Sequence, residues 1–227
     1  MTHREVSGHG RSLAEPGRFA HDDGAPDEAI RHAKGHRDLM SALQAGRVLV
    51  AVVAVVDEIE DIDGRTADKS SDMSIVSMVA ADGRRGLLAF SGLDALQRWD
   101  PTARPVPVSG IDAARAALDD GCEALIVDVA GPRMQVVTEI DLLTLAGIDP
   151  LEHARGLAAA LFEEAFAPAT VQVLVKDEQL LVRSLDSSIT ARDLAAALTP
   201  RIVGLVPGGI AVQDGLAVQD GLAVRES

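Results

Sequence analysis

The sequence predicts an α+β protein in which a mixed β-sheet is flanked by helices. Three observations lead to this class. Short apolar runs rich in Val, Leu and Ile alternate along the chain with segments of helical pattern. Four of these apolar runs end in Ser or Thr with Asp three residues later, which is typical of a helix N-terminus. Aromatic residues make up only 2% of the chain, so the core must be built mainly from aliphatic side chains.

The first predicted segment, residues 1–38, is a charged, partly disordered N-terminal arm that holds five of the six histidines. A helix is expected from Pro26 into Leu43, because proline is favoured in the first turn of a helix. Val48–Val56 is apolar at every position, as in a strand buried on both faces. Asp57–Asp72 carries seven acidic residues and is predicted to be a solvated loop.

Further strands of the same sheet are predicted at Met73–Val79, Gly86–Phe90, Val106–Val108, Ala124–Val129 and Met134–Val137. The Asp82-Gly83 pair between the first two of these predicts a hairpin. Short helices are expected after Phe90 to about Trp99, at Asp112–Asp120 and at Asp141–Leu145. Capping-box-like starts are predicted at Ser91/Asp94, Ser109/Asp112, Thr138/Asp141 and Thr190/Asp193.

Residues 39–150 are therefore predicted to form a first domain, followed by a small β-β-α-β region at residues 151–207. That region comprises a helix at 151–166, strands at Val171–Val175 and Leu180–Leu185, a helix at Thr190–Leu198 and a strand at Ile202–Val206. The pattern fits either a second subdomain or an extension of the first sheet.

The last segment, residues 208–227, is a tail with a six-residue repeat that starts at Ile210, Leu216 and Leu222. Three copies are too few for a β-helix, so a loosely ordered tail is expected. The apolar residues of the repeat leave open that it adds an edge strand. We expect both the arm and the tail to be dispensable for the core.

Charge and composition restrict the classes of function. The net charge is −14, which argues against binding to nucleic acid or to an anionic membrane surface. The longest apolar run, Val48–Val56, is far shorter than the roughly 20 residues of a membrane-spanning helix, and residues 1–38 have no apolar core of a signal peptide. The single cysteine, Cys122, fits a reducing compartment. A cytoplasmic location is expected.

Several short segments resemble a known family. They are Lys69–Val76, Asp82–Arg85, Phe90-Ser91, Trp99–Pro101, Ala103–Val108 and Asp128–Pro132, in this order. Together they resemble the SseB N-terminal domain family in its actinobacterial form, from about Gly24 to Pro150. The family is named for enhanced serine sensitivity, so the resemblance implies a link to amino-acid metabolism and a protein partner among its enzymes. It supplies no catalytic residues.

The common catalytic and metal-binding patterns are missing from the sequence. Ser91 and Ser109 have no glycine two residues before them, so neither lies in a G-x-S-x-G elbow. His32 and His36 have the spacing of a zinc pair but lack a third ligand, and surface histidines are the favoured interpretation. Cys122 is expected to be unreactive, because it follows a helix C-terminus and precedes Glu123. No metal and no cofactor is predicted.

The remaining candidate site lies where predicted strands end and helices begin. Ser91-Gly92 and Ser109-Gly110 could meet at one edge of the sheet, with Arg98 and Arg104 near them in sequence to attract an anion. Ordinary helix capping is the competing interpretation, and Asp94 and Asp112 favour it. Trp99 is either a packing anchor or a contact residue for a partner. The predicted function is a non-catalytic binding or regulatory module. The alternative is an enzyme whose site is assembled near Ser91 and Ser109.

Overall fold

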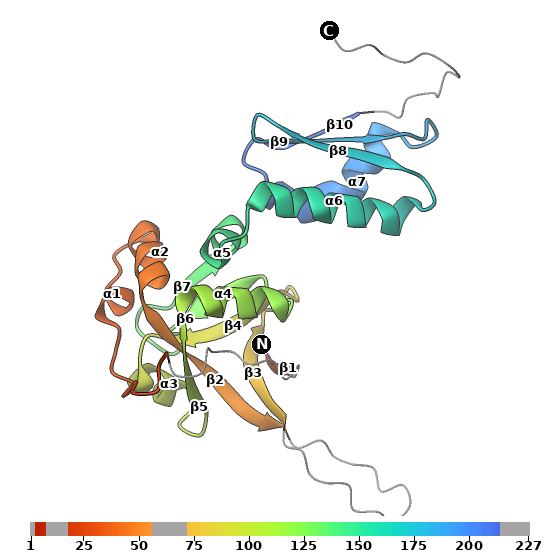
Figure 1. Ribbon diagram of the computed structural model, residues 1–227. Helices are drawn as coiled ribbons and strands as arrows, with labels where there is room; N and C mark the ends of the chain where they lie inside the picture. The colour runs from red at the N-terminus through yellow and green to blue at the C-terminus, as the bar shows by residue number, and fades with distance from the viewer. Residues whose placement is uncertain (1–2, 8–17, 56–71, 214–227) are drawn as a thin grey trace, which may run out of the picture. The chain divides into compact units, whose positions relative to one another are not determined.

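The computed structural model describes residues 3–7, 18–55 and 72–213 (Figure 1). Its internal contacts divide the chain into two compact units, Met1–Gly147 and Ile148–Ser227, each of which is described by itself. The division falls close to the boundary predicted after residue 150. Most of the predicted acidic loop lies in residues 56–71, outside the described residues.

The first unit is a mixed sheet with helices packed on it. Its strands are β1 (His3–Ser7), β2 (Arg47–Val55), β3 (Asp72–Val79), β4 (Arg85–Phe90), β5 (Arg104–Ser109), β6 (Ala124–Val127) and β7 (Gln135–Thr138). Its helices are α1 (Glu28–Arg31), α2 (His36–Ala45), α3 (Leu93–Trp99), α4 (Gly110–Asp119) and α5 (Glu139–Ala146). The predicted α+β class is confirmed, and each predicted strand of this sheet has its counterpart.

Six of the seven strands follow the order β1-β3-β2-β4-β6-β7, and the seventh, β5, pairs with β2 beside this path. The β3–β4 hairpin predicted at Asp82-Gly83 is present, with Ser77 opposite Leu87. All neighbours are antiparallel except β4 and β6, which run parallel with Ala89 opposite Val127. These two strands therefore end at the same edge of the sheet, where α/β folds commonly bind ligands.

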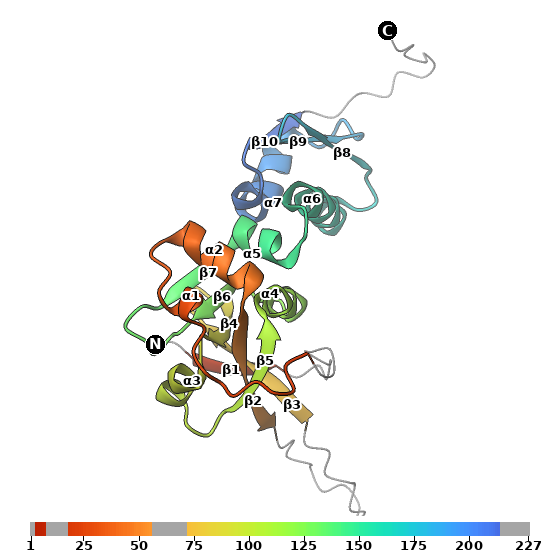
Figure 2. The same ribbon diagram turned by 60° about the vertical axis from the view of Figure 1, so that its left-hand side comes forward.

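The central strands are apolar throughout because both faces of the sheet are covered. Val48 and Val50 face a core cluster formed with α1, α2, α4 and α5. Leu49 and Ala51 face a second cluster formed with α3. In Figures 1 and 2, α3 accordingly lies on the other side of the sheet from α4. The alternation of side chains along a strand explains why this segment has no polar face.

The segment predicted as an arm becomes part of the core from Asp27 onward. The expected single helix from Pro26 to Leu43 is split into α1 and α2, because His32–Gly35 interrupts it. Ile30 is fully buried in the first core cluster, together with Leu39 and Leu43. Residues 27–38 are therefore not separate from the domain, and the expectation that they are dispensable does not agree with this packing.

The second unit contains α6 (Pro150–Phe166), β8 (Val171–Lys176), β9 (Gln179–Ser184), α7 (Ala191–Ile202), the short 3₁₀ helix η1 (Val203–Leu205) and β10 (Ile210–Gln213). The three strands form a sheet in the order β10-β9-β8. Its core joins Leu180 and Val182 of β9 to buried residues of α6 and α7. The unit is thus a β-β-α-β arrangement preceded by a helix.

One predicted strand in this unit is wrong. Ile202–Val206 is not a strand, because α7 continues through Pro200 and buries Leu198 and Ile202 one turn apart on the same helix face. The last strand is instead β10, which lies within the first copy of the tail repeat. The open alternative that the repeat supplies an edge strand thus holds for residues 210–213. Residues 214–227 lie outside the described residues.

The four predicted helix starts behave differently. Thr190 and Asp193 form a complete capping box at α7. The Ser109 hydroxyl accepts a hydrogen bond from the Asp112 backbone N–H at the start of α4. The other two side chains make no capping bond: Gly92, not Ser91, is the N-cap of α3, and Thr138 leaves α5 uncapped. The hydroxyl of Ser91 has a different partner.

Candidate functional site

The candidate site begins where the parallel strands β4 and β6 end. Ser91 follows β4, and Asp128 follows β6. The Asp128 carboxylate accepts two hydrogen bonds from Ser91, one from the backbone N–H at 2.8 Å and one from the hydroxyl at 2.7 Å. Both residues are buried. This pair ties the two strand ends together and uses the hydroxyl that sequence analysis assigned to a helix cap.

The backbone at Asp128 is held in the left-handed region, with φ 54°. Asp tolerates this conformation better than most residues. The Asp128 N–H donates to the Ala89 carbonyl at 3.0 Å, and its carbonyl accepts from the Gly131 N–H at 2.8 Å. The turn that contains Gly131-Pro132 thereby brings Arg133 to the same edge of the sheet.

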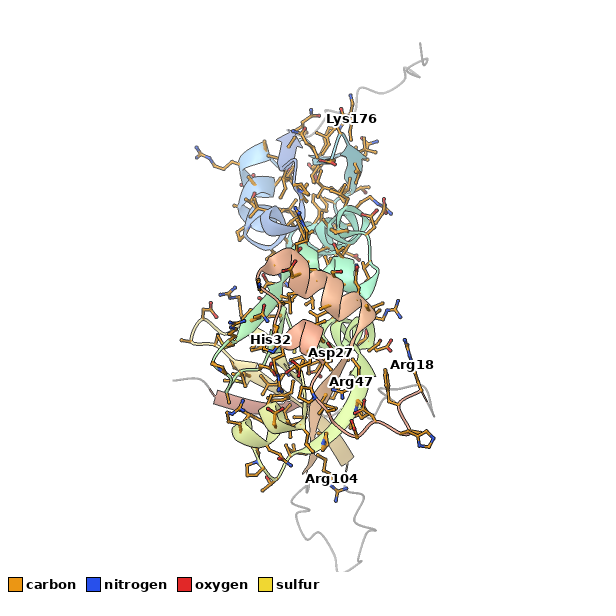
Figure 3. The ribbon with its side chains drawn as sticks, turned by 90° about the vertical axis from the view of Figure 1, so that its left-hand side faces the viewer. Arg18, Asp27, His32, Arg47, Arg104 and Lys176 are labelled. Carbon is orange, nitrogen blue, oxygen red and sulfur yellow. The ribbon has the colours of Figure 1, made fainter. Side chains whose placement is uncertain are left out.

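The segment before β2 closes over this edge. The Ser91 carbonyl accepts hydrogen bonds from the Asp27 N–H at 2.8 Å and from Arg47 Nη1 at 3.2 Å. Asp27 caps α1 through its side chain, and it lies beside Arg47 in Figure 3. As a result Arg31, at the end of α1, reaches the Ser91 hydroxyl with its Nε at 3.4 Å.

A cavity of about 300 Å³ lies at this edge. It is lined by Arg31, His32, Asp94, Ala95, Arg98, Asp128, Gly131, Pro132 and Arg133. Three arginines and one histidine thus face two carboxylates, in a chain whose net charge is −14. The arginines come from α1, from α3 and from the loop after β6, so only the fold brings them together.

Asp94 links two of these arginines. It forms an ion pair with Nη2 of Arg31 and a longer contact of 3.5 Å with Nη2 of Arg98. Partial burial raises the pKa of Asp94, but the hydrogen bond and positive charge of Arg31 outweigh it, so the pKa of this carboxyl lies below its usual value. Asp94 therefore stays ionised and holds both guanidinium groups at the cavity.

A family model described as the SseB protein N-terminal domain matches residues 27–140. The chain belongs to the SseB family. The match spans every residue that lines the cavity, whereas the second unit lies beyond it. No curated protein and no solved structure matches the chain.

Within the SseB domain, the two predicted helix N-termini are covered by neighbouring backbone. A Cβ on Gly92 would lie 2.8 Å from the Cα of Pro26, and the Leu93 N–H already donates to the Gly24 carbonyl. A Cβ on Gly110 would lie 2.1 Å from the Leu43 carbonyl oxygen at the end of α2. Neither helix start is open to an anion, and the cavity is built from side chains instead.

The other predicted site residues fall in three places. Arg98 lines the cavity and is joined to Ser91 through Asp94 and Arg31. Ser109 lies at the end of β5 next to Arg47, is buried, and does not line the cavity. Arg104 is exposed at the opposite end of β5, and Figure 3 shows it apart from His32 and Asp27.

Trp99, the candidate contact residue, packs against the second core cluster. Its ring centroid lies 5.5 Å from that of Phe90, and the side chain is half-buried. Its position in the structure therefore accounts for a packing role. As the last residue of α3, it lies one residue from Arg98 of the cavity.

Sequence reasoning missed Arg31, Asp128 and Arg133, and it weighed His32 only as half of a zinc pair. Arg31 and His32 lie in the segment interpreted as an arm, where the short apolar pattern around Ile30 was the only local signal of a packed helix. Asp128 had a usable signal: an acidic residue directly after a buried strand and before Gly131-Pro132. Its pairing with Ser91 depends on β4 and β6 being parallel neighbours, which no local pattern shows.

The histidines and Cys122 have partners of other kinds. His32 Nε2 lies 3.0 Å from Glu28, and His36 Nε2 lies 3.0 Å from Asp141, so the two histidines do not converge. Across the described ranges, no group of three or more metal-ligating side chains is placed to hold an ion. Burial, and then the negative charge of Asp120, raise the pKa of the Cys122 thiol to about 11. None of the described helices is long and apolar enough to cross a membrane.

Proposed function

We propose that this SseB-family protein is a non-catalytic binding module whose first unit holds a small anionic ligand in the cavity beside Ser91 and Asp128. The observation that carries the proposal is the convergence of Arg31, Arg98 and Arg133 on one cavity of about 300 Å³. Guanidinium groups match carboxylate and phosphate oxygens in geometry as well as in charge. The cavity volume suits a small molecule rather than a polymer.

The charges at the cavity support an anionic ligand over a cationic one. Asp94 is engaged by Arg31, and Asp128 accepts two hydrogen bonds from Ser91. Both carboxylates thus already have hydrogen-bonding partners before any ligand enters, whereas Arg133 makes no hydrogen bond or ion pair among the described residues. Three guanidinium groups against two carboxylates also leave the lining with an excess of positive charge, which favours an anion.

The position of Ser91 supports a binding role over catalysis. Its hydroxyl is fully buried, donates to Asp128 and accepts from Arg31. A nucleophilic serine needs an exposed oxygen and a neighbouring base that takes its proton. His32, the histidine at the cavity, has Nε2 directed to Glu28 instead. The competing proposal of an enzyme acting near Ser91 and Ser109 has no comparable support, because Ser109 lies away from the cavity.

Anion titration of matched arginine variants tests the ligand class. Inorganic phosphate and acetate are titrated at constant ionic strength, while the fluorescence of Trp99 reports binding at α3. Arg98→Gln and Arg133→Gln are expected to raise the Kd of the bound anion about tenfold, because each removes one charge-assisted hydrogen bond. Arg104→Gln is the control, since Arg104 is an exposed arginine that does not line the cavity.

Two results would contradict the ligand proposal. One is a lack of saturable binding of either anion by the wild-type protein. The other is an equal loss of affinity in Arg104→Gln and Arg98→Gln, which would mean that the anions respond only to total charge.

We further propose a regulatory role in the cytoplasm, linked to amino-acid metabolism and exerted through a protein partner. The support is the SseB family and the phenotype behind its name. Affinity capture with the full-length protein, followed by mass spectrometry, tests this part. Reproducible recovery of an amino-acid biosynthetic enzyme would support it, and recovery of no partner under any growth condition would count against it.

A further inference from the structure

An apolar surface continues from the cavity along the outer strands of the first sheet. β7 is the last of the described strands in the order of this sheet, and it pairs with β6. Val136 of β7 lies opposite Ile126 of β6, and Ile126 packs on the core cluster that α3 helps to form. Directly paired residues of adjacent strands share one face, so Val136 lies on the α3 side of the sheet.

The helix α3 covers this face only in part. It packs on β2 and β4, where Leu88 is fully buried. Leu88, Ile126 and Val136 form one row across β4, β6 and β7. Along this row the side chains change from buried Leu88 to half-buried Ile126, and then to Val136, which is 43% exposed. The apolar face therefore emerges from beneath α3 and opens to solvent at β7.

Two further apolar residues connect this row with the cavity. Val129 follows Asp128 and is half-buried against the same core cluster. Met134 follows Arg133 and is 54% exposed. Both therefore adjoin residues that line the cavity. We refer to these four residues as the apolar strip: Ile126, Val129, Met134 and Val136.

The charges next to the apolar strip indicate what kind of ligand fits it. Arg98 and Arg133 line the cavity at one end of the strip, in a chain whose net charge is −14. An anionic group is therefore attracted to that end. The strip itself has one side chain of each of two strands in width, and such strands lie about 4.8 Å apart. This width suits a single flexible aliphatic chain.

We propose that the ligand of the cavity is an anion with a short aliphatic chain, such as an alkyl carboxylate or an alkyl phosphate. Its head group binds at Arg98 and Arg133, and its chain lies on the apolar strip. The inference rests on the proposed anion site, because that site holds the head group. Ile126 precedes Asp128 by two residues, so Val136 lies about 7 Å along the strands from the cavity edge, which a chain of about five carbons spans.

A chain-length series with the full-length protein tests this proposal. Acetate, butyrate and hexanoate are titrated at constant ionic strength, with the fluorescence of Trp99 as the signal. Inorganic phosphate and butyl phosphate form a second series that distinguishes the two head groups. Full burial of one methylene raises affinity about fourfold, and the open strip should supply about half of that free energy. Hexanoate should therefore bind about fifteenfold more tightly than acetate.

Matched variants locate the bound chain. Met134→Gln/Val136→Thr makes the strip polar and nearly preserves the shapes of two exposed side chains, so the ratio of the acetate Kd to the hexanoate Kd should fall below about three. Leu174→Gln/Val175→Thr is the control, because it changes two exposed apolar strand residues of the second unit and should keep the full ratio. Arg133→Gln should weaken both acids by the same factor, since it acts on the carboxylate that they share.

Four results would overturn the proposal. Saturable acetate binding with no gain for hexanoate would leave the anion site standing and exclude the strip. A gain that survives Met134→Gln/Val136→Thr would place the chain elsewhere. A hexanoate affinity that is unaffected by Arg98→Gln and Arg133→Gln would exclude the anion site as well. A dimer in sedimentation that Met134→Gln/Val136→Thr abolishes would assign the strip to a second copy of this chain.

Discussion

Replacing Asp128 with alanine should destabilise the first unit strongly. The variant loses both hydrogen bonds from Ser91, at 2.8 Å and 2.7 Å, and leaves the buried Ser91 N–H without its acceptor. Hydrogen bonds to a charged group contribute about 1.5–3 kcal/mol each, so loss of the two bonds in Asp128→Ala should lower the free energy of unfolding by about 3–6 kcal/mol. Alanine is also less suited than Asp to the left-handed conformation with φ 54°.

Two matched variants separate the contributions. Asp128→Asn keeps one acceptor oxygen and tolerates the left-handed conformation, so it should cost about 1–2 kcal/mol. Ser91→Ala removes only the hydroxyl and keeps the bond from the Ser91 N–H, so it should cost about 1–3 kcal/mol. The expected order of stability is therefore wild type, then these two variants, then Asp128→Ala.

Urea unfolding at pH 7 measures these differences. Trp99 is the only tryptophan and packs on Phe90 in the first unit, so its fluorescence reports the unfolding of that unit. A cost below about 1 kcal/mol for Asp128→Ala would refute the reasoning, since it would mean that the two hydrogen bonds contribute little. So would an Asn variant that is as unstable as the Ala variant.

Three other predictions concern separate parts of the first unit. Ile30→Ala should lower the free energy of unfolding by about 2–4 kcal/mol in the same assay, because Ile30 is fully buried; a cost near zero would restore the idea of a dispensable arm. Burial and Asp120 raise the pKa of the Cys122 thiol to about 11. At pH 8 this thiol should therefore react with iodoacetamide roughly a hundredfold more slowly in the native protein than in the unfolded chain. Equal rates in the two states would contradict its burial. The stability lost in Arg31→Leu should be constant near neutral pH and should shrink as the pH falls below about 4, because Asp94 has a lowered folded pKa and its contribution is lost on protonation. A pH-independent difference would show that Arg31 acts through packing or its hydrogen bond to Ser91 and not through Asp94.

The candidate site could be anticipated only in part. Ser91 was singled out because it follows an apolar run, and Arg98 because it is near Ser91 in sequence; the fold does place Arg98 at the cavity. The expected role was different, since the hydroxyl of Ser91 binds Asp128 instead of a helix N-terminus. Arg104 was included only for its nearness in sequence, and it lies at the other end of β5. Nearness in sequence is a poor guide to nearness in space here, because the extended six-residue strand β5 separates Arg104 from the edge of the sheet where Ser109 lies.

By itself, the sequence determined the fold class and the positions of most elements, because those depend on local patterns. Val48–Val56 identified a strand covered on both faces, and Thr190 with Asp193 identified the start of α7. Even so, Ile202 became the last residue of α7 and Val203–Leu205 formed the 3₁₀ helix η1, since burial of Leu198 and Ile202 outweighed the β-forming tendency of this segment.

The tertiary structure alone decided which distant residues meet. Asp128 pairs with Ser91 only because β4 and β6 are parallel neighbours, and Arg31 reaches them only because the Asp27 N–H is bound to the Ser91 carbonyl. These contacts join residues 37 to 64 positions apart, so no periodicity or local motif encodes them. Strand neighbours are selected by the packing of both sheet faces at once, and that selection is a property of the whole chain.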